Sequence, residues 1–312
     1  MFLENVEISN KLDKDFSQSS LSHAYLFYGP KGIGKFSHAK NFARAILTEN
    51  PEQIRYFSGI DNYNSPDLDI IESDNTIKKA EIEELIEKSF SKPFNGKYKV
   101  VIINDFDKVT VEGQNALLKT LEEPMDYLIL ILITSNFEKI LPTIISRCRI
   151  LKFSEVDEAR IEKLLLSKSV SEKNAKLFSR LAHGSVCLAI KYTENPELLQ
   201  LREDLIEILD SLIRKSGYLF TKLDFFKDNK DKIIDIFNFF LIWYRDLFFV
   251  KSGVKDLVIN LDKIELLELQ DVSFEEAIAG YDSILRAIER LDKNINFDLN
   301  IEKLLIELGG VR

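Results

Sequence analysis

Residues 26–36 are of the types that bind a phosphate. They read Leu-Phe-Tyr-Gly-Pro-Lys-Gly-Ile-Gly-Lys-Phe, an apolar strand that runs into a glycine-rich loop. Gly29, Gly32 and Gly34 free the backbone N–H groups to turn toward phosphate oxygens, and Lys35 adds a positive charge at the end of the loop. The spacing predicts a P-loop whose lysine and glycines form a nucleotide site.

Phe36 departs from the P-loop pattern at the position that would bind a metal ion. A P-loop usually has Ser or Thr after its lysine, because that hydroxyl coordinates Mg²⁺. Phe36 has no oxygen in its side chain. The loop is therefore shaped for a nucleotide and poorly equipped for metal. Whether ATP still binds is left open by the residues themselves.

A second candidate group lies at the end of the apolar run 99–105, Lys-Val-Val-Ile-Ile-Asn-Asp. A buried parallel strand delivers an acid to the carboxyl edge of a sheet in this way, so Asp105 is the predicted acid of the nucleotide site. Hydrolysis also needs a group that orients the attacking water. That group is expected at the next residue, which here is Phe106. Strand alternation predicts that the Asp107 side chain points away from the position next to Asp105. The hydrolytic base is then missing or comes from elsewhere.

Strands that alternate with helices must position these groups. Apolar runs predict the strands, and apolar residues at three- and four-residue steps predict the helices. Together they predict a parallel sheet flanked by helices. The strands are expected at 24–28, 68–72, 99–105, 128–134 and 150–153, and the helices at about 35–47, 77–90 and 110–123. Thr134, Ser135 and Asn136 end the fourth of these strands, where they either contact a phosphate or cap the next helix.

From residue 156 onward the pattern is helical only, so the predicted fold class is α/β followed by all-α. The segment 233–250 is rich in aromatic residues on more than one face. A helix that is apolar all round must be buried by something. These aromatic side chains are therefore either core residues or part of an oligomer interface.

The composition of the 312-residue chain indicates a globular protein of two or three domains. Its net charge of −9 argues against a protein that grips DNA by itself, because neutralising phosphates takes concentrated Lys and Arg. Cys148 and Cys187 provide neither a disulfide framework nor a set of four zinc ligands. Without a signal peptide or a long apolar segment, we expect a cytoplasmic protein and no membrane insertion.

Four longer stretches carry a resemblance to a known family. They are Ser22-His-Ala-Tyr-Leu-Phe27, Asn115-Ala-Leu-Leu-Lys-Thr-Leu-Glu-Glu-Pro124, Leu141-Pro-Thr-Ile-Ile-Ser-Arg-Cys148 and Asn294-Ile-Asn-Phe-Asp-Leu-Asn-Ile-Glu-Lys-Leu-Leu305. With the P-loop, they resemble the AAA+ clamp-loader family of bacterial DNA polymerase III, specifically its delta-prime branch. The resemblance implies a P-loop AAA+ domain over 1–154, a helical lid over 155–196 and a C-terminal helical collar domain for oligomerisation over 197–312.

The resemblance also implies a function in DNA replication. Members of this branch sit in a hetero-pentamer with gamma/tau and delta subunits, which loads the sliding clamp onto primer-template DNA as part of the DNA-directed DNA polymerase III holoenzyme. Arg147 of the Ser-Arg-Cys motif would act as an arginine finger in the ATP site of a neighbouring subunit. The alternative for Arg147 is an ordinary salt bridge at a helix end. The resemblance also implies that Lys35 and Asp105 are remnants of the chain's own site.

Three departures from the motor subunits of this family argue against hydrolysis. Phe36 replaces the metal-binding hydroxyl, Phe106 replaces the water-orienting glutamate, and Cys187 replaces the arginine of the lid motif Gly-Ser-x-Arg. We therefore expect a largely non-hydrolysing stator without intrinsic catalysis or a polymerase site, in which ATP binding stays open. Relatives often have a four-cysteine zinc module, but the insertion at 48–66 has no Cys, so no zinc is expected. The alternatives are an active gamma/tau-type motor ATPase and an unrelated P-loop nucleotide kinase.

Overall fold

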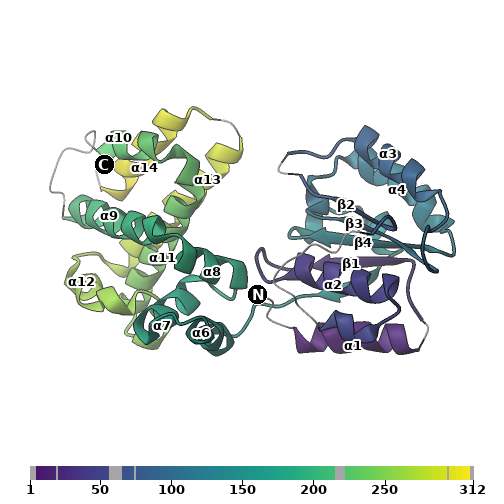
Figure 1. Ribbon diagram of the computed structural model, residues 1–312. Helices are drawn as coiled ribbons and strands as arrows, with labels where there is room; N and C mark the ends of the chain where they lie inside the picture. Colours follow the sequence, from purple (N-terminus) through teal and green to yellow (C-terminus); the bar gives the residue numbers. More distant parts are fainter. Residues whose placement is uncertain are drawn as a thin grey trace. The chain divides into compact units, whose positions relative to one another are not determined.

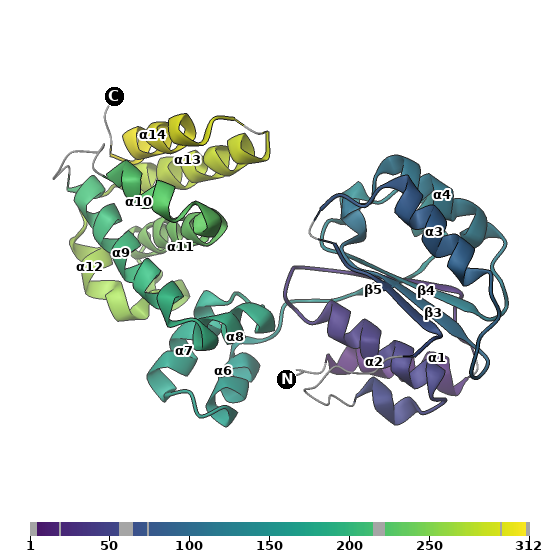
Figure 2. The same ribbon diagram turned by 45° about the horizontal axis from the view of Figure 1, so that its top comes forward.

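The computed structural model describes residues 5–18, 20–55, 65–73, 75–214, 222–293 and 295–309. Figures 1 and 2 show the chain from two directions. It folds as two compact units, the first made of residues 1–164 and 183–188 and the second of residues 165–182 and 189–312. Residues 56–64 of the insertion predicted at 48–66 lie outside the described residues. The predicted division into three domains stays a prediction.

A parallel five-stranded sheet in the order β2-β3-β4-β1-β5 forms the centre of the first unit. Its strands are β1 (Ala24–Tyr28), β2 (Leu68–Ile71), β3 (Lys99–Ile103), β4 (Leu128–Thr134) and β5 (Arg149–Lys152). Every residue of β3 and β4 is buried, which explains why both sequences lack polar alternation. The predicted parallel sheet is confirmed. Since all strands run the same way, the loops after β1, β3 and β4 meet at one edge.

Helices cover both faces of this sheet (Figures 1 and 2). Helices α1 and α2 lie on one face, and α3 and α4 lie on the other. The helical elements of this part of the chain are α1 (Val6–Ser17), α2 (Lys35–Leu47), η1 (Pro51–Ile54), α3 (Lys79–Ser89), η2 (Phe106–Lys108), α4 (Val111–Glu122), η3 (Phe137–Lys139) and α5 (Pro142–Ile145). Thr110 begins α4 by accepting a hydrogen bond from the Gly113 N–H, as an N-cap residue does.

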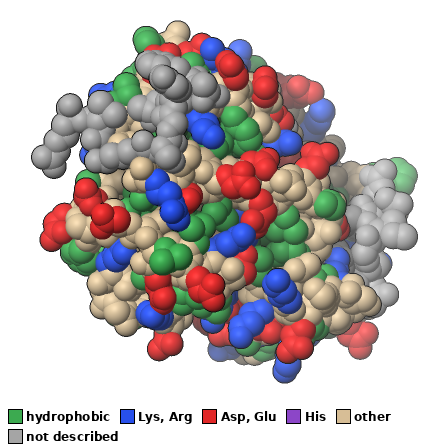
Figure 3. Space-filling view, turned by 90° about the vertical axis from the view of Figure 1, so that its left-hand side faces the viewer, with side chains coloured by type: hydrophobic (Ala, Val, Ile, Leu, Met, Phe, Trp, Pro, Cys, Tyr) green, Lys and Arg blue, Asp and Glu red, His purple; other side chains and the backbone are tan. Residues whose placement is uncertain are grey.

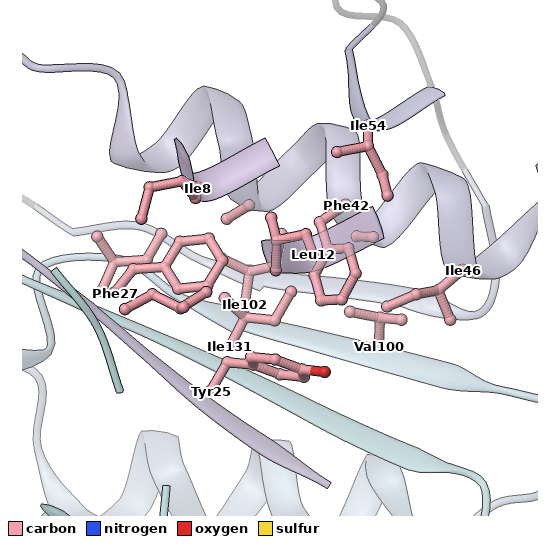
Figure 4. Packing of buried hydrophobic residues seen from close by; sticks show 14 of the residues in the cluster. Ile8, Leu12, Tyr25, Phe27, Phe42, Ile46, Ile54, Val100, Ile102 and Ile131 are labelled. Carbon is pink, nitrogen blue, oxygen red and sulfur yellow. The ribbon is translucent and has the colours of Figure 1, made fainter. Parts of the chain in front are cut away.

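Alternate residues of the buried strands supply two separate cores. Figure 4 shows the core under α1 and α2, where Ile8, Leu12 and Phe42 pack on Tyr25 and Phe27 of β1. The neighbouring strand residues point to the opposite face and join the core under α3 and α4. A strand buried on both faces therefore holds the loops at its ends between two packed layers.

The second unit is helical, as predicted for the C-terminal region. Its helical elements, together with the two helices shared with the first unit, are α6 (Glu158–Ser167), α7 (Glu172–Leu181), α8 (Val186–Glu194), α9 (Pro196–Ile213), α10 (Leu223–Asp228), η5 (Lys230–Lys232), α11 (Ile233–Lys251), η6 (Lys255–Leu257), η7 (Leu261–Lys263), α12 (Ile264–Leu269), α13 (Phe274–Asp292) and α14 (Phe297–Leu308). Helix α11 packs on α9, α12 and α13. One face of the molecule, seen in Figure 3, mixes acidic, basic and hydrophobic side chains.

Most aromatic residues of α11 belong to the core of the second unit. Phe237, Phe240 and Trp243 are almost fully buried, and the Trp243 indole N–H donates to the Gln270 side-chain oxygen at 3.0 Å. Phe248 and Phe249, at the end of α11, are only half-buried and line a shallow apolar hollow. The core interpretation of this helix is therefore confirmed for its central turns.

Candidate functional site

The P-loop backbone has the left-handed conformations that its glycines allow. Gly32 has φ +75° and Gly34 has φ +94°, and Gly34 is the N-cap of α2. Gly29 has φ +148°, and a Cβ atom there would lie 2.2 Å from the Phe153 carbonyl oxygen. A side chain at Gly32 or Gly34 would strain the backbone. A side chain at Gly29 would collide with Phe153, the residue that follows β5. The N-terminus of α2 then faces the loop with its free N–H groups, which is the arrangement that binds anions.

Lys35 is buried at the centre of this loop. Its side-chain amine donates to the Gly29 and Pro30 carbonyl oxygens at 2.6 Å each, and lies 3.3 Å from the Ser135 hydroxyl. Burial lowers the pKa of Lys35 to about 8, although the carboxylates of Asp105 and Asp107 oppose the shift. The amine is thus mostly protonated near neutral pH and could exchange its carbonyl partners for phosphate oxygens.

Phe36 gives the first turn of α2 an apolar side chain. It packs, partly buried, against the core under α1 and α2, and the Lys40 amine lies 4.4 Å from the centre of its ring. The chain therefore places an aromatic ring at the position where a P-loop hydroxyl would coordinate Mg²⁺. The residues fit the phosphates of a nucleotide, held by the loop amides and Lys35, but they do not fit its metal ion.

The structure corrects the predicted end of β3. The strand stops at Ile103, so Asn104 is the residue that follows it directly. Asp105 has a left-handed backbone (φ 48°) and pairs with the Lys108 amine at 2.9 Å. Phe106 is fully buried in the core under α3 and α4. Packing explains the aromatic side chain of Phe106, and its replacement of a water-orienting glutamate stays a prediction.

Asp107 is a site residue that strand alternation assigned wrongly. Residues 106–108 form a 3₁₀ helix, so the two-residue period of a strand does not apply to them. The Asp107 carboxylate accepts hydrogen bonds from the Thr134 hydroxyl at 2.9 Å and from the Ser135 N–H at 3.2 Å. It therefore ties the end of β3 to the end of β4, next to Lys35. The Thr134 hydroxyl also accepts from the Asn136 N–H at 3.0 Å, a local turn within residues 134–136. Asn136 is the N-cap of η3 but makes no side-chain capping bond, so the capping role that the sequence suggested is not seen.

A segment far along the chain also reaches the P-loop. The Cys187 N–H donates to the Gly32 carbonyl oxygen at 3.0 Å, where α8 begins. The resemblance places an arginine of motor subunits at this position. Cys187 brings a backbone donor to the loop but no positive side chain. No motif or spacing in the sequence predicts this contact.

Arg147 lies near the amino ends of the strands, whereas the P-loop lies at their carboxyl ends. It follows α5 and precedes β5, and its guanidinium donates to the Thr143 carbonyl at 2.9 Å and to the Glu122 carboxylate at 2.8 Å. The side chain is about one-third exposed, at 34%. The ion pair with Glu122 at the end of α4 is the salt bridge that we named as the alternative to a finger. Both partners are partly in solvent, so the pair is weak enough to exchange.

The family described as "DNA polymerase III, delta subunit" matches residues 4–157, and "DNA polymerase III, delta subunit, C terminal" matches residues 196–309. The DNA polymerase III subunit delta' of Bacillus subtilis is 30% identical over 96% of this chain and 93% of its own length. The chain belongs to the DNA polymerase III delta-prime family. The resemblance seen in the sequence is confirmed.

Relatives of this delta-prime family member also include gamma/tau subunits of DNA polymerase III. The gamma/tau subunit of Mycoplasma genitalium is 29% identical over 95% of this chain, which spans about half (53%) of that relative's length. Among solved structures, a gamma subunit-related protein of Thermotoga maritima is 18% identical, covers 97% of this chain and 98% of its own, and has a TM-score of 0.45. Thermotoga maritima RuvB is 12% identical, covers 98% and 87%, and has a TM-score of 0.47.

His38 is a further residue beside the P-loop that the sequence analysis did not identify. Its ring, 1% exposed, accepts from the Asn5 N–H through Nε2 at 3.0 Å, so Nδ1 carries the proton and donates to the Gly34 carbonyl at 2.9 Å. The imidazole therefore links the start of α1 to the last glycine of the P-loop. A histidine one helical turn after the loop gives no sequence signal for this, because its partner Asn5 is distant in the chain.

The stability of the protein is expected to fall in mild acid because of His38. Burial lowers the pKa of His38 to about 4, whereas an unfolded histidine keeps a value near 6.5. The unfolded chain therefore binds the proton first, and stability is lost as the pH falls from about 6.5 toward 4. Between pH 7 and pH 5 this amounts to roughly 2 kcal/mol. Urea unfolding of the wild type and of His38→Gln at both pH values measures it, and equal pH dependence in the two proteins would contradict it.

Over the part of the chain that the structure describes, no group of three or more His, Cys, Asp and Glu residues is placed to hold a metal ion. The absence of zinc stays a prediction. No helix within the described ranges combines the length and the apolar character that crossing a bilayer takes.

Proposed function

We propose that this chain is a non-hydrolysing stator of the clamp loader that lends Arg147 to the ATP site of a neighbouring subunit. The observation that carries the proposal is the position of Arg147 relative to the strands of the sheet. The P-loop leaves the carboxyl end of β1, whereas Arg147 precedes the amino end of β5, which runs parallel beside β1 with Tyr25 opposite Arg149. A strand of five residues spans about 16 Å. The guanidinium thus lies at the edge opposite its own P-loop, which suits a site in another subunit.

Two features support the absence of hydrolysis in the chain's own site. Phe36 cannot coordinate Mg²⁺, and the residue that directly follows β3 is Asn104, a neutral amide that makes a poor substitute for an anionic metal ligand. Phosphoryl transfer depends on a metal that neutralises the developing charge. A nucleotide held by Lys35 and the loop amides would therefore stay intact.

The guanidinium of Arg147 has the chemistry for action in a neighbouring site. It is planar, permanently charged and able to donate several hydrogen bonds to phosphate oxygens. In the isolated chain the Glu122 carboxylate holds it at the surface. Exchange of this partner for a bound phosphate would complete an ATP site that the neighbour supplies. The group acts on the neighbour's substrate, so the chain itself needs no catalytic machinery.

We assign the partners from the family. They are the gamma/tau and delta subunits in a hetero-pentamer, and through that complex the sliding clamp and primer-template DNA of the DNA polymerase III holoenzyme. The match of this chain to delta' and, over nearly its full length, to gamma/tau supports a ring of similar subunits. We assign oligomerisation to the C-terminal helical collar domain over 197–312, which follows the AAA+ domain and the lid in the sequence.

Phosphate release by the purified chain tests the proposal. With ATP and Mg²⁺ in excess we expect no steady release, because the metal position is occupied by Phe36. In the reconstituted complex, Lys35→Ala should leave ATP-driven clamp loading within about twofold of the wild type, whereas the same change in the P-loop of gamma/tau should abolish it. Turnover by the isolated chain at ordinary ATPase rates, about 1 s⁻¹ or faster, would instead support the motor ATPase alternative.

A further inference from the structure

The segment His183–Leu188 packs with the first unit although the residues on either side of it belong to the second. Its backbone is tied down at two points. The Cys187 N–H donates to the Gly32 carbonyl at 3.0 Å, and the Gly184 carbonyl accepts from the Val156 N–H at 3.1 Å. The first of these bonds joins the segment to the middle of the P-loop. Both bonds use backbone groups, so they do not depend on the side chain of Cys187.

The fit between the segment and the P-loop leaves no room for extra atoms. A Cβ atom on Gly32 would lie 2.1 Å from the Ser185 hydroxyl oxygen and 3.3 Å from its Cβ. A Cβ atom on Gly184 would lie 2.5 Å from the Glu155 Cβ. Ser185 cannot turn away without loss, because its hydroxyl accepts from the Leu188 N–H at 3.2 Å and caps the start of α8. Close approach here therefore requires glycine on both sides.

Several carbonyl groups of the P-loop also have hydrogen-bond donors in this arrangement. The carbonyls of Gly29 and Pro30 accept from the Lys35 amine, and the Gly34 carbonyl accepts from His38. With the Gly32 carbonyl bonded to Cys187, four carbonyl groups of residues 29–34 have donors from the chain itself. These hydrogen bonds favour one conformation of the loop.

We propose that residues 184–187 form a latch that closes on the P-loop without nucleotide. This P-loop latch rests on the proposed stator function, because a subunit that does not cycle ATP needs a loop geometry that does not change with ATP. The latch supplies it through the Gly32–Cys187 backbone bond and the Gly32–Ser185 contact. The P-loop then has a structural role, because it holds the segment His183–Leu188 in place.

A double-mutant cycle on the full chain tests the contact. Gly32→Ala should lower the thermal midpoint through its left-handed backbone and its collision with Ser185, and Ser185→Gly should recover at least about 2 °C of that loss. Gly34→Ala is the matched control, because Gly34 is also left-handed (φ +94°) but the nearest atom to its Cβ lies 3.7 Å away. Ser185→Gly should recover nothing in that background. Equal effects of Ser185→Gly in both backgrounds would overturn the latch.

Hydrogen exchange followed by mass spectrometry tests whether the latch closes without a ligand. In the wild type without nucleotide, we expect slow exchange in peptides that cover 28–36 and 183–188, and no more than about a twofold change when ATP is added. Gly32→Ala should speed exchange in 183–188 by about tenfold or more, and Gly34→Ala should not. Protection that appears only with ATP would overturn the proposal. Neither experiment measures ATP hydrolysis, so the latch and the arginine finger can fail independently.

Discussion

Replacing Arg147 with alanine is expected to lower ATP hydrolysis at the neighbouring site by about 10³-fold or more, because a trans-acting arginine contributes that much to phosphoryl transfer. The total rate of the reconstituted complex should fall by at least the share of that site. The fold of this chain should be unaffected. Arg147 is partly exposed, and its ion pair with Glu122 is of a kind that contributes about 0–1 kcal/mol.

Glu122→Gln is the matched control for Arg147→Ala. It breaks the same ion pair but leaves the guanidinium free to reach a phosphate. If Arg147 is a finger, Glu122→Gln keeps the ATPase rate while it changes stability about as little as Arg147→Ala. Arg147→Lys should lose most of the activity as well, since an ammonium lacks the planar fork. Steady-state phosphate release, with assembly checked by size-exclusion chromatography, measures all three variants. Wild-type rates for an assembled Arg147→Ala complex would remove the finger assignment.

The elements that frame the P-loop could be predicted to the residue. The strand at 24–28 and the helix at 35–47 have the predicted bounds, and so does β4 at 128–134. Two kinds of signal made this possible. A fully buried parallel strand appears in the sequence as a continuous apolar run, and the glycines of the loop separate the strand from the helix.

The end of β3 could not be predicted, for a physical reason. The run 99–103 is followed by Asn104 and Asp105, and an apolar run does not say at which polar residue the hydrogen-bonded ladder stops. The left-handed backbone of Asp105 and the 3₁₀ turn after it change the direction of every later side chain. Phe106 therefore faces the core, and Asp107 faces the loop, opposite to the strand-based expectation.

Contacts between distant residues account for the rest of what the sequence did not show. Asp107 with Thr134, His38 with Asn5, and Gly32 with Cys187 each join parts of the chain that come together only when the sheet forms. No periodicity or spacing encodes such pairs. The sequence suggested a salt bridge for Arg147 but not its partner, because Glu122 is 25 residues away.

The buried position of Phe106 leads to the largest expected effect on stability. Restoring a catalytic glutamate there, Phe106→Glu, is expected to unfold the chain and not to create an ATPase. Removing a buried phenylalanine costs about 3–5 kcal/mol, and burying an unpaired carboxylate costs several more. Domains of this kind are stable by about 5–15 kcal/mol in total, so little of the folded state would remain. Circular dichroism of the purified variant, with soluble yield, measures the loss.

Asp105→Glu is the control that separates this explanation from a nucleotide-site role. It places the same glutamate one residue earlier, where the side chain is about one-third exposed and pairs with Lys108. We expect it to stay within about 1 kcal/mol of the wild type in urea unfolding, because an exposed ion pair tolerates one more methylene. Phe106→Leu should cost about 1–2 kcal/mol, as a smaller apolar side chain in the same core. If Phe106→Glu folds as well as Asp105→Glu, residue 106 faces solvent or the loop. Packing would then not explain Phe106, and the loss of a catalytic glutamate would be the better explanation.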